Sequence, residues 1–173
     1  ILEQVLSAEP AHHEGLLAFA DLALQQRDIA LAAEAISKAL EYYPDDAEVL
    51  HHAGLIHLQA DNEADALICF TSALSLQEDN ISVLTTLANH YLQKNQWRQA
   101  YSYLECLCRI DPRNASSLLG LGTACLRLGD YQAAEAALVK SLRIDGNNLK
   151  TIINLGATYR MTKNYAMARQ ILL

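Results

Sequence analysis

Alanine recurs at an interval of 34 residues along the chain. The five members of this series are Ala32, Ala66, Ala100, Ala134 and Ala168. Twelve residues before each of them stands a glycine or another alanine, at Ala20, Gly54, Ala88, Gly122 and Gly156. A fixed interval of this length is typical of a small structural unit stacked many times, in which each copy buries its apolar face against its neighbours. The sequence therefore predicts a repeat architecture with a long surface rather than a closed catalytic pocket.

Large apolar residues flank the small ones at a spacing of four. They stand four residues before the Gly or Ala, at Leu16, Leu50, Leu84, Leu118 and Ile152, and four residues after the recurrent alanine, at Ile36, Phe70, Leu104, Leu138 and Leu172. A spacing of four places these residues on one face of a helix. Small residues that face each other let two helix backbones approach closely, and the large side chains fill the space around that contact.

Each copy is predicted to contain two helices. In the second copy they cover residues 47–59 and 63–76, joined by a polar turn at Asp61-Asn62. The equivalent turns are Arg27-Asp28, Asn95-Gln96, Gly129-Asp130 and Lys163-Asn164. Proline occupies one equivalent position between copies, at Pro10, Pro44 and Pro112, where it ends one helix before the next begins. Short turns require antiparallel neighbours, so the predicted fold is an all-α solenoid of antiparallel helix pairs.

The recurrent positions together form a family pattern. In the fourth copy they hold Leu118, Leu121, Gly122, Tyr131, Ala134 and Leu138, with Pro112 at the preceding junction. This pattern resembles the tetratricopeptide repeat, in registers that begin at His13, Ala47, Ile81, Ala115 and Leu149. The resemblance implies a right-handed α-solenoid and a single array over residues 1–173. Its expected parts are the end of a preceding repeat (1–12), four repeats (13–46, 47–80, 81–114 and 115–148) and an incomplete fifth (149–173).

The second copy departs most from the others. Ala53 stands where the other copies have a large apolar residue, and Glu63 stands where they have Ile, Trp or Tyr. Underfilled or polar core positions cost packing energy, about 1 kcal/mol or more each. We therefore expect residues 47–80 to form the least stable repeat.

Both ends of the sequence fall inside a predicted second helix. Leu2, Val5 and Leu6 form the apolar stripe of the first of these, and the chain stops at Leu172-Leu173 in the other. Stacked repeats need polar caps to stay in solution. We expect either a piece of a longer array or multidomain protein, or an apolar end that docks onto another chain as a homo-oligomer.

The two halves of the chain carry opposite charge. Residues 1–80 contain 15 acidic and 2 basic residues, a net charge of −13, whereas residues 81–173 contain 5 acidic and 11 basic residues, a net charge of +6. Residues 47–80 contain no Lys or Arg, and residues 149–173 contain no Asp or Glu. Two interpretations follow: solvated surfaces that differ in composition, or charge that steers a partner or a second copy onto the chain.

The four cysteines, Cys69, Cys106, Cys108 and Cys125, form no CxxC pair. Their first interpretation is as small buried residues, which slightly favours a reducing compartment such as the cytoplasm. The alternative is a redox or metal role for Cys106 and Cys108. These two residues are two apart on a predicted helix and so point in different directions, which disfavours shared chelation.

No catalytic or metal-binding motif is present in the sequence. The six histidines include no HExxH arrangement, and no Ser-His-Asp order, glycine-rich phosphate loop or carboxylate pair stands out. His57 is interpreted as a packed core residue and His51 as a groove residue. We therefore expect no enzyme activity, no metal site and no cofactor in this segment.

Nucleic acid and membrane are both disfavoured as partners. Phosphate binding needs a basic stripe with base-reading side chains, and the overall balance of this chain is acidic, at −7. No stretch approaches the ~18 consecutive apolar residues of a membrane span. The expected partner is a protein or peptide.

The resemblance also implies where such a partner binds. In proteins of this family the first helices of successive repeats line a concave groove. The positions that face it here are Leu17, Asp21, Gln25, His51, Leu55, Gln59, Thr85, Asn89, Gln93, Leu119, Thr123, Arg127, Ile153, Ala157 and Met161. Apolar residues separated by amides and hydroxyls suit an extended or helical segment. For the apolar members, packing between adjacent first helices is the competing interpretation.

Two known roles of the family are disfavoured by residues at matching positions. Chaperone adaptors bind a C-terminal carboxylate through a clamp rich in Lys and Asn, and only Asn89 fits such a clamp here. Sugar-transferring relatives carry an asparagine before the Leu-Gly pair of successive repeats, and only Asn154 matches.

Three hypotheses for the function remain. The first is a protein–protein interaction scaffold that binds a peptide or helix in the groove. The second is the regulatory or substrate-recruiting arm of a larger enzyme or secretion assembly. The third is a self-assembling module that uses the ends of the chain and its charge separation.

Overall fold

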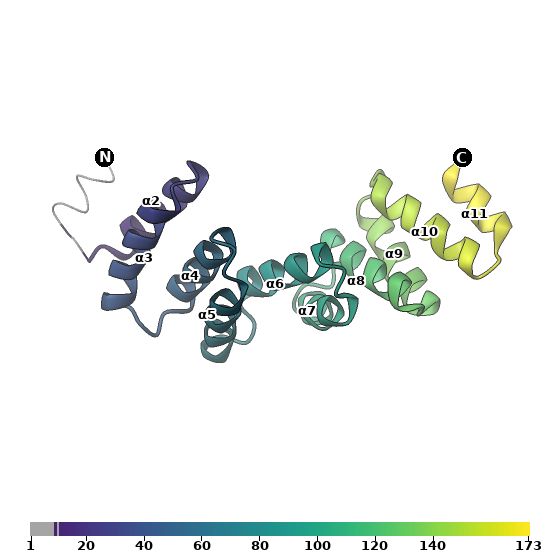
Figure 1. Cartoon of the computed structure of the whole chain (residues 1–173). Coiled ribbons are helices and arrows are strands. Elements are labelled where there is room, and N and C mark those ends of the chain that lie inside the picture. Colours follow the sequence, from purple (N-terminus) through teal and green to yellow (C-terminus); the bar gives the residue numbers. More distant parts are fainter. Residues whose placement is uncertain (1–8, 10) are drawn as a thin grey trace. The chain divides into compact units, whose positions relative to one another are not determined.

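The computed structural model describes residue 9 and residues 11–173, and all regular structure in this part of the chain is α-helical. Its ten helices are α2 (His13–Gln25), α3 (Ile29–Tyr42), α4 (Ala47–Gln59), α5 (Glu63–Leu76), α6 (Ile81–Gln93), α7 (Trp97–Ile110), α8 (Ala115–Leu128), α9 (Tyr131–Ile144), α10 (Leu149–Met161) and α11 (Tyr165–Leu172) (Figure 1). The all-α prediction is confirmed. The predicted stripe of Leu2, Val5 and Leu6 lies outside the described residues.

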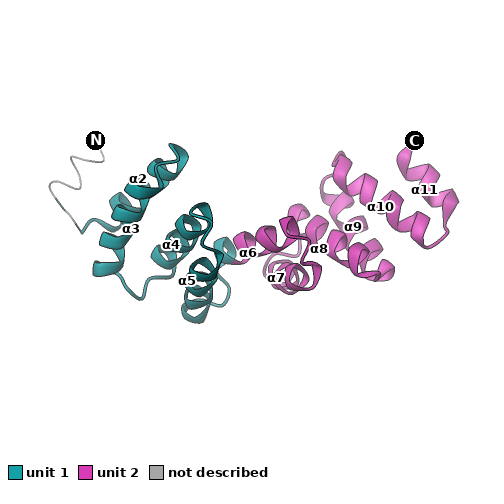
Figure 2. Ribbon diagram, viewed as in Figure 1, with its two compact units in different colours: residues 1–83 teal, residues 84–173 magenta. Residues whose placement is uncertain are grey.

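The chain forms two compact units (Figure 2). Unit 1 comprises residues 1–83 and unit 2 comprises residues 84–173. In unit 1, α4 packs against α2, α3 and α5; in unit 2, α8 packs against α7, α9 and α10. Helices α2, α4, α6, α8 and α10 begin where the sequence places the five registers. A single array that continues through both units stays a prediction.

The turns inside the helix pairs share one hydrogen-bonding scheme. After α2, the N–H of Asp28 donates to the carbonyl of Ala23 at 2.9 Å, and the N–H of Arg27 donates to that of Leu24 at 3.0 Å. This is a Schellman motif, which places one residue in the left-handed region. Arg27 has a φ of 61°. The same bonds recur after α4, α6, α8 and α10, with the left-handed residues Asp61, Asn95, Gly129 and Lys163.

The residue that completes this motif also starts the next helix. Oδ1 of Asp28 accepts a hydrogen bond from the N–H of Leu31 at 3.0 Å, and Oδ1 of Asp130 accepts from the N–H of Ala133 at 3.0 Å. Such a cap satisfies one of the backbone donors that a helix start leaves unpaired. Asp28 and Asp130 thus serve two helices each, the preceding one through the backbone N–H and the following one through the side-chain carboxylate.

Close helix contacts depend on the recurrent small residues. A Cβ added to Gly122 would lie 2.5 Å from Cγ of Leu138, and one added to Gly156 would lie 2.9 Å from Cδ1 of Leu172. The ring of Phe70 leaves no room for a Cβ on Gly54 either. The periodicity predicts that each glycine faces the recurrent alanine, with large side chains around that contact. In the structure the nearest atoms belong to the large residue four positions after the alanine, and the carbonyl oxygen of Ala134 lies slightly farther from the Cβ position of Gly122, at 3.3 Å.

The second repeat is filled mainly by Phe70, which is fully buried. Ala53 is buried with it, while His57 and Glu63 are only half-buried. The lower stability expected for residues 47–80 stays a prediction.

Candidate functional site

The predicted groove positions lie on the first helix of each pair. Those in unit 1 come from α2 and α4, and those in unit 2 come from α6, α8 and α10. Three pockets, two in unit 1 and one in unit 2, collect nine of them.

The larger pocket of unit 1 has a volume of about 650 Å³. It is lined by Asp21, Asp46, Ala47, Glu48, His51, His52, Leu55, Gln77, Asn80 and Ser82. Asp21, His51 and Leu55 were predicted as groove residues. The carboxylates of Asp46 and Glu48 were not, so this pocket is more acidic than the sequence analysis indicated.

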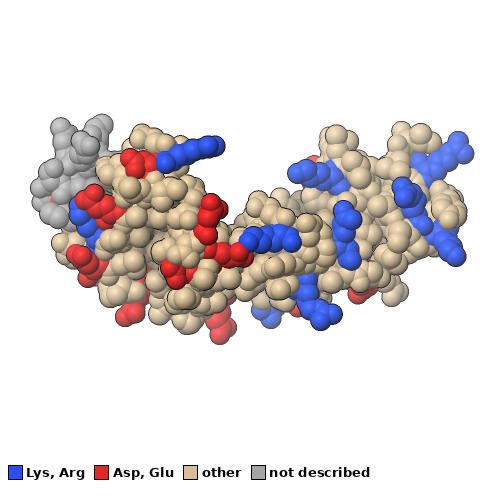
Figure 3. Space-filling view, in the orientation of Figure 1, with Lys and Arg blue, Asp and Glu red and all other residues tan. Residues whose placement is uncertain are grey.

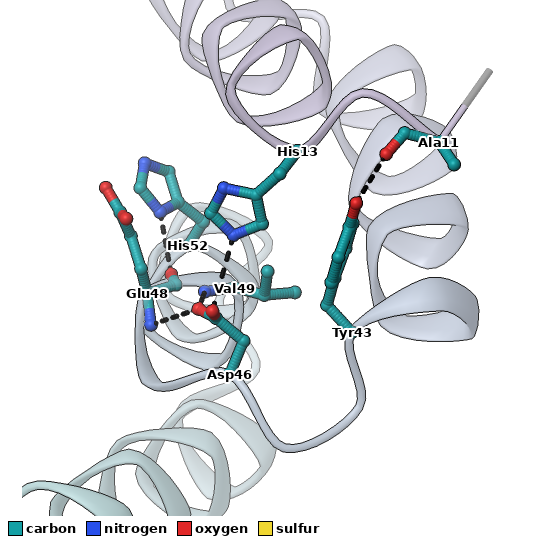
Figure 4. Close-up of polar contacts among 7 residues, drawn as sticks. All are labelled: Ala11, His13, Tyr43, Asp46, Glu48, Val49 and His52. Atoms are coloured by element: carbon teal, nitrogen blue, oxygen red, sulfur yellow. Dashed lines mark hydrogen bonds and ion pairs between the residues drawn. The ribbon is translucent and has the colours of Figure 1, made fainter. Parts of the chain in front are cut away.

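A histidine–carboxylate contact connects α2 with α4 at this pocket. Nε2 of His52 lies 3.2 Å from Oδ1 of Asp21. Nδ1 of His52 lies 2.8 Å from the carbonyl oxygen of Glu48 (Figure 4). A carbonyl and a carboxylate oxygen only accept hydrogen bonds. Both ring nitrogens of His52 thus face acceptor oxygens, one on α2 and one on α4.

A second histidine–carboxylate contact lies at the start of α4. Oδ1 of Asp46 accepts hydrogen bonds from the N–H groups of Glu48 and Val49 at 2.8 and 3.0 Å, and its Oδ2 lies 3.4 Å from Nε2 of His13 (Figure 4). Nearby, the hydroxyl of Tyr43 donates to the carbonyl of Ala11 at 2.7 Å.

Protonation in this pocket follows from these surroundings. Burial and, to a smaller extent, the neighbouring His52 lower the pKa of His51 from 6.5 to about 4, against the opposing effect of Asp21. His51 is therefore neutral at pH 7. Burial alone would raise the pKa of the Asp46 carboxyl, but the N–H groups of Val49 and Glu48 and the His13 ring outweigh it, so the pKa is lowered.

The smaller pocket of unit 1 has a volume of about 400 Å³. It contains the predicted residues Gln25 and Gln59, together with Leu24, Arg27 and Ile29. It lies at the C-terminal ends of α2 and α4, so the two glutamines and the acidic group around Asp21 line separate pockets.

The pocket of unit 2 has a volume of about 490 Å³ and mainly apolar walls. It is lined by Asn89, Leu92, Trp97, Ser116, Leu119, Gly120, Thr123, Lys150, Ile153 and Asn154. Asn89, Leu119, Thr123 and Ile153 were predicted as groove residues. Two side-chain amides, from Asn89 and Asn154, flank aliphatic side chains here, which is the combination that holds a peptide backbone together with an anchoring side chain.

Two polar contacts organise this pocket. Nδ2 of Asn154 donates to Oγ1 of Thr123 at 2.8 Å, which joins α10 to α8. Asp21 and His52 in unit 1 stand the same 31 residues apart as this pair, so both contacts link one first helix to the next. The guanidinium carbon of Arg127 lies 5.6 Å from the centroid of the Trp97 ring, a cation–π contact.

Sequence reasoning missed the contributions of Trp97, Lys150 and His52 to these pockets. Trp97 begins a second helix at a core position of the repeat, and Lys150 stands one residue into α10. The contact between Asp21 and His52 joins residues 31 positions apart on successive first helices, and a search for complementary side chains at this interval would have indicated it.

The remaining predicted positions occupy different surroundings. Leu17 is buried in the core of unit 1 with 5% of its surface exposed, while Met161 is 54% exposed at the end of α10. Thr85 and Gln93 are exposed on α6, and Ala157 is half-buried on α10. That these residues contact a partner stays a prediction.

Three of the cysteines lie in surroundings that disfavour the thiolate. Burial raises the pKa of Cys108 and of Cys125 to about 11, and it also raises the pKa of Cys69. All four thiols are free. Over residues 11–173 and residue 9, no three His, Cys, Asp or Glu side chains converge in a way that could hold a metal ion.

Charge divides along the same boundary as the compact units. On the face drawn in Figure 3, Asp and Glu predominate over unit 1 and Lys and Arg over unit 2. Within the described part of the chain, no helix combines the length and the apolar composition that a membrane crossing requires.

The fold and its pockets define a helical repeat protein, and its sequence matches one family of such proteins. The tetratricopeptide repeat model matches residues 17–81 and 85–148. The chain belongs to the tetratricopeptide repeat family. Members of this family are generally non-catalytic scaffolds that bind proteins or peptides. No curated protein sequence gives a significant match.

Several solved structures share the fold at low sequence identity. YrrB, described as a TPR protein with an unusual peptide-binding site, has a TM-score of 0.81 and 19% identity, with 99% of this chain and 88% of YrrB covered. MamA from Desulfovibrio magneticus RS-1 has a TM-score of 0.80 and 17% identity, with 92% and 90% covered. Pseudomonas aeruginosa pilF has a TM-score of 0.76 and 20% identity, with 92% and 72% covered.

Proposed function

We propose that this protein is a scaffold that holds a partner peptide or helix against its first helices and carries out no catalytic step of its own. The observation that supports this function is the pocket of unit 2. Its apolar walls are formed by Leu92, Leu119 and Ile153, and Ile153 is 60% exposed although it is a large aliphatic residue. An exposed aliphatic side chain beside side-chain amides is typical of a peptide-recognition surface.

The side-chain amides of this pocket can orient a bound peptide backbone. Asn154 is held in place by its hydrogen bond to Thr123, so its remaining carbonyl oxygen has a fixed orientation. Asn89 on α6 contributes a second side-chain amide to the lining of the pocket. Two amides that offer both donors and acceptors match the N–H and C=O groups of an extended backbone or of a helix end. YrrB, with its peptide-binding site, supports the same use of the fold.

The test compares two variants of the full chain as bait in a native lysate. The first combines Ile153→Asp with Asn89→Ala in the pocket. The control combines Ile144→Asp with Gln132→Ala, both on α9 and exposed, outside the pocket. Circular dichroism and thermal unfolding establish that each variant is folded.

We expect the control to retain the partners of the natural chain and the pocket variant to lose them. Removal of an anchor contact at the centre of an interface typically costs ~2 kcal/mol or more, so the loss of affinity is expected to exceed tenfold. Equal capture by both variants would place the binding surface elsewhere and contradict the proposal.

A further inference from the structure

The first helices of unit 2 carry cations and no carboxylates. Helices α6, α8 and α10 contain no Asp or Glu, while Arg127, Lys150 and Arg160 lie on α8 and α10. Lys150 lines the unit 2 pocket directly, beside the exposed Ile153. None of the ion pairs in the described part of the chain involves Lys150, Arg127 or Arg160. The pocket therefore suits an aliphatic side chain that is accompanied by negative charge.

A surface of this kind exists on unit 1 of the same chain. Ile68 on α5 is 62% exposed, more than any other large apolar side chain of the described part of unit 1. Asp65 precedes it by three residues, so the two side chains lie one turn apart on α5. Asp61 extends the acidic stretch into the preceding turn. We call Ile68, Asp65 and Asp61 the Ile68 surface.

No positive side chain interrupts the Ile68 surface in the sequence. Between Lys38 and Lys94 the chain contains no Lys or Arg. One oxygen of Asp65, Oδ2, accepts a hydrogen bond from Nδ2 of Asn62 at 2.6 Å, which holds the carboxylate near the N-terminus of α5. The charged side chains of the Ile68 surface are both carboxylates, whereas the charged side chain that lines the apolar pocket of unit 2 is the cation Lys150, so the two surfaces are complementary.

We propose that the unit 2 pocket receives the Ile68 surface of a second copy of this chain. Ile68 enters between Leu119 and Ile153, and Asp65 pairs with Lys150 at the edge of the pocket. The inference rests on the proposed use of this pocket as a binding site and adds the identity of its occupant. Each copy carries both surfaces, and the two surfaces differ from each other, so the contact is heterologous and extends into chains or rings of copies.

The test uses sedimentation velocity of the full chain after nuclease treatment. We expect the mean mass to rise with protein concentration and to fall as salt is added, because screening weakens the attraction between the two charged units. A mass that stays monomeric over the whole concentration range at low salt would overturn the inference. Loss of the association on nuclease treatment would do so too, since it would assign the basic surface to nucleic acid.

Two variants separate the two surfaces. Ile68→Lys removes the Ile68 surface and leaves the pocket, whereas Lys150→Glu removes the cation of the pocket and leaves the Ile68 surface. Each is expected to weaken self-association roughly tenfold or more on its own. An equimolar mixture of the two is expected to form a heterodimer that grows no further, because only one productive contact remains. Both residues are exposed, so the fold is preserved.

Matched controls carry the same chemical changes outside both surfaces. Ile144→Lys and Arg143→Glu lie on the exposed end of α9 and are expected to associate as the natural chain does. Combining Asp65→Lys with Lys150→Glu exchanges the charges and is expected to restore association. A mixture that stays monomeric, or controls that lose association to the same extent, would contradict the proposed contact. Capture of partners from a lysate by the Ile68→Lys variant is a separate readout. If the natural chain does not self-associate but partners are still captured, the contact between copies is contradicted and the proposed scaffold function is not.

Discussion

Four of the five turns inside the helix pairs place a residue with a side chain in the left-handed region. Arg27, Asp61, Asn95 and Lys163 have φ values of 61°, 56°, 58° and 60°, and Gly129 occupies the fifth position with a φ of 85°. In this region Cβ lies close to the carbonyl oxygen, which costs about 1 kcal/mol for residues other than glycine. Each of the four turns therefore carries a small backbone strain energy, which is smaller than the stabilisation from the hydrogen bonds of the Schellman motif.

Relief of that strain is measurable at Lys163. We expect Lys163→Gly to raise the free energy of unfolding by roughly 0.5 kcal/mol, since part of the gain is offset by the greater freedom of glycine in the unfolded chain. Gly129→Ala should lower the free energy of unfolding by about 1 kcal/mol. Urea denaturation with an unchanged m-value checks both changes. A loss of stability in Lys163→Gly would contradict the expectation.

The buried imidazole of His51 makes unit 1 sensitive to acid. Its pKa is about 4 in the folded chain and 6.5 as a reference, so the unfolded chain binds the proton more readily between these values. The His51 contribution to stability is complete above pH 6.5 and is lost as the pH falls toward 4. The His51 ring is only half-buried, at the wall of an open pocket, and solvent screens its charge. Its contribution to the free energy of unfolding is therefore expected to change by roughly 1 kcal/mol between pH 7 and pH 5.

The matched variant is His51→Gln. Its free energy of unfolding is expected to fall less between pH 7 and pH 5 than that of the natural chain, by the same ~1 kcal/mol. Urea denaturation of both proteins at the two pH values measures the difference. Parallel losses in both proteins would show that His51 does not carry the effect.

At the scale of helices, the repeats differ in how their shared positions are filled. The fourth repeat has a buried polar contact at its boundary with α10, where Oγ of Ser141 donates to the carbonyl of Ala115 at 2.9 Å and lies 3.3 Å from Oγ1 of Thr151. In the second repeat, the Phe70 ring packs against Gly54 and Ala53 is buried, while the polar Glu63 occupies a position that is apolar or aromatic elsewhere.

This difference predicts unequal local stability. We expect the amides of residues 47–80 to exchange with solvent at least about tenfold faster than those of residues 115–148, as a local deficit near 1.4 kcal/mol implies. Hydrogen exchange followed by mass spectrometry resolves the two segments in one experiment. Equal protection would show that Phe70 compensates fully for the smaller and polar residues around it.

Helix positions and pocket residues were predictable to different degrees, for physical reasons. The helix starts follow from local chemistry, because Asp28 and Asp130 need only the next few residues to act as caps. Leu55 and Ile153 were predictable because their positions recur in every copy. Trp97 stands at a position that is apolar or aromatic in most copies and was therefore interpreted as core, but in the structure it is only half-buried and borders the unit 2 pocket. The contact between Asp21 and His52 depends on how neighbouring helices cross, which the periodicity of one helix does not contain.

For the whole molecule, the separation of charge is the main determinant of its interactions. The boundary between the compact units falls within three residues of the point where the sequence changes from acidic to basic. A partner of one charge is therefore attracted by one unit and repelled by the other. Association rates should depend on ionic strength, and the sign of that dependence identifies which unit a given partner approaches.

The residue that ends one helix and caps the next affects how such a molecule can change its length. Asp28 and Asp130 each complete the end of one helix and cap the next, so deletion of a single helix leaves backbone groups that only water can satisfy. When 34 residues are deleted or duplicated, from any starting point, each capping residue still stands between a first helix and a second helix of the repeat. We therefore expect this architecture to gain or lose whole helix pairs. The gain or loss of a single helix would leave unpaired backbone amides at the junction.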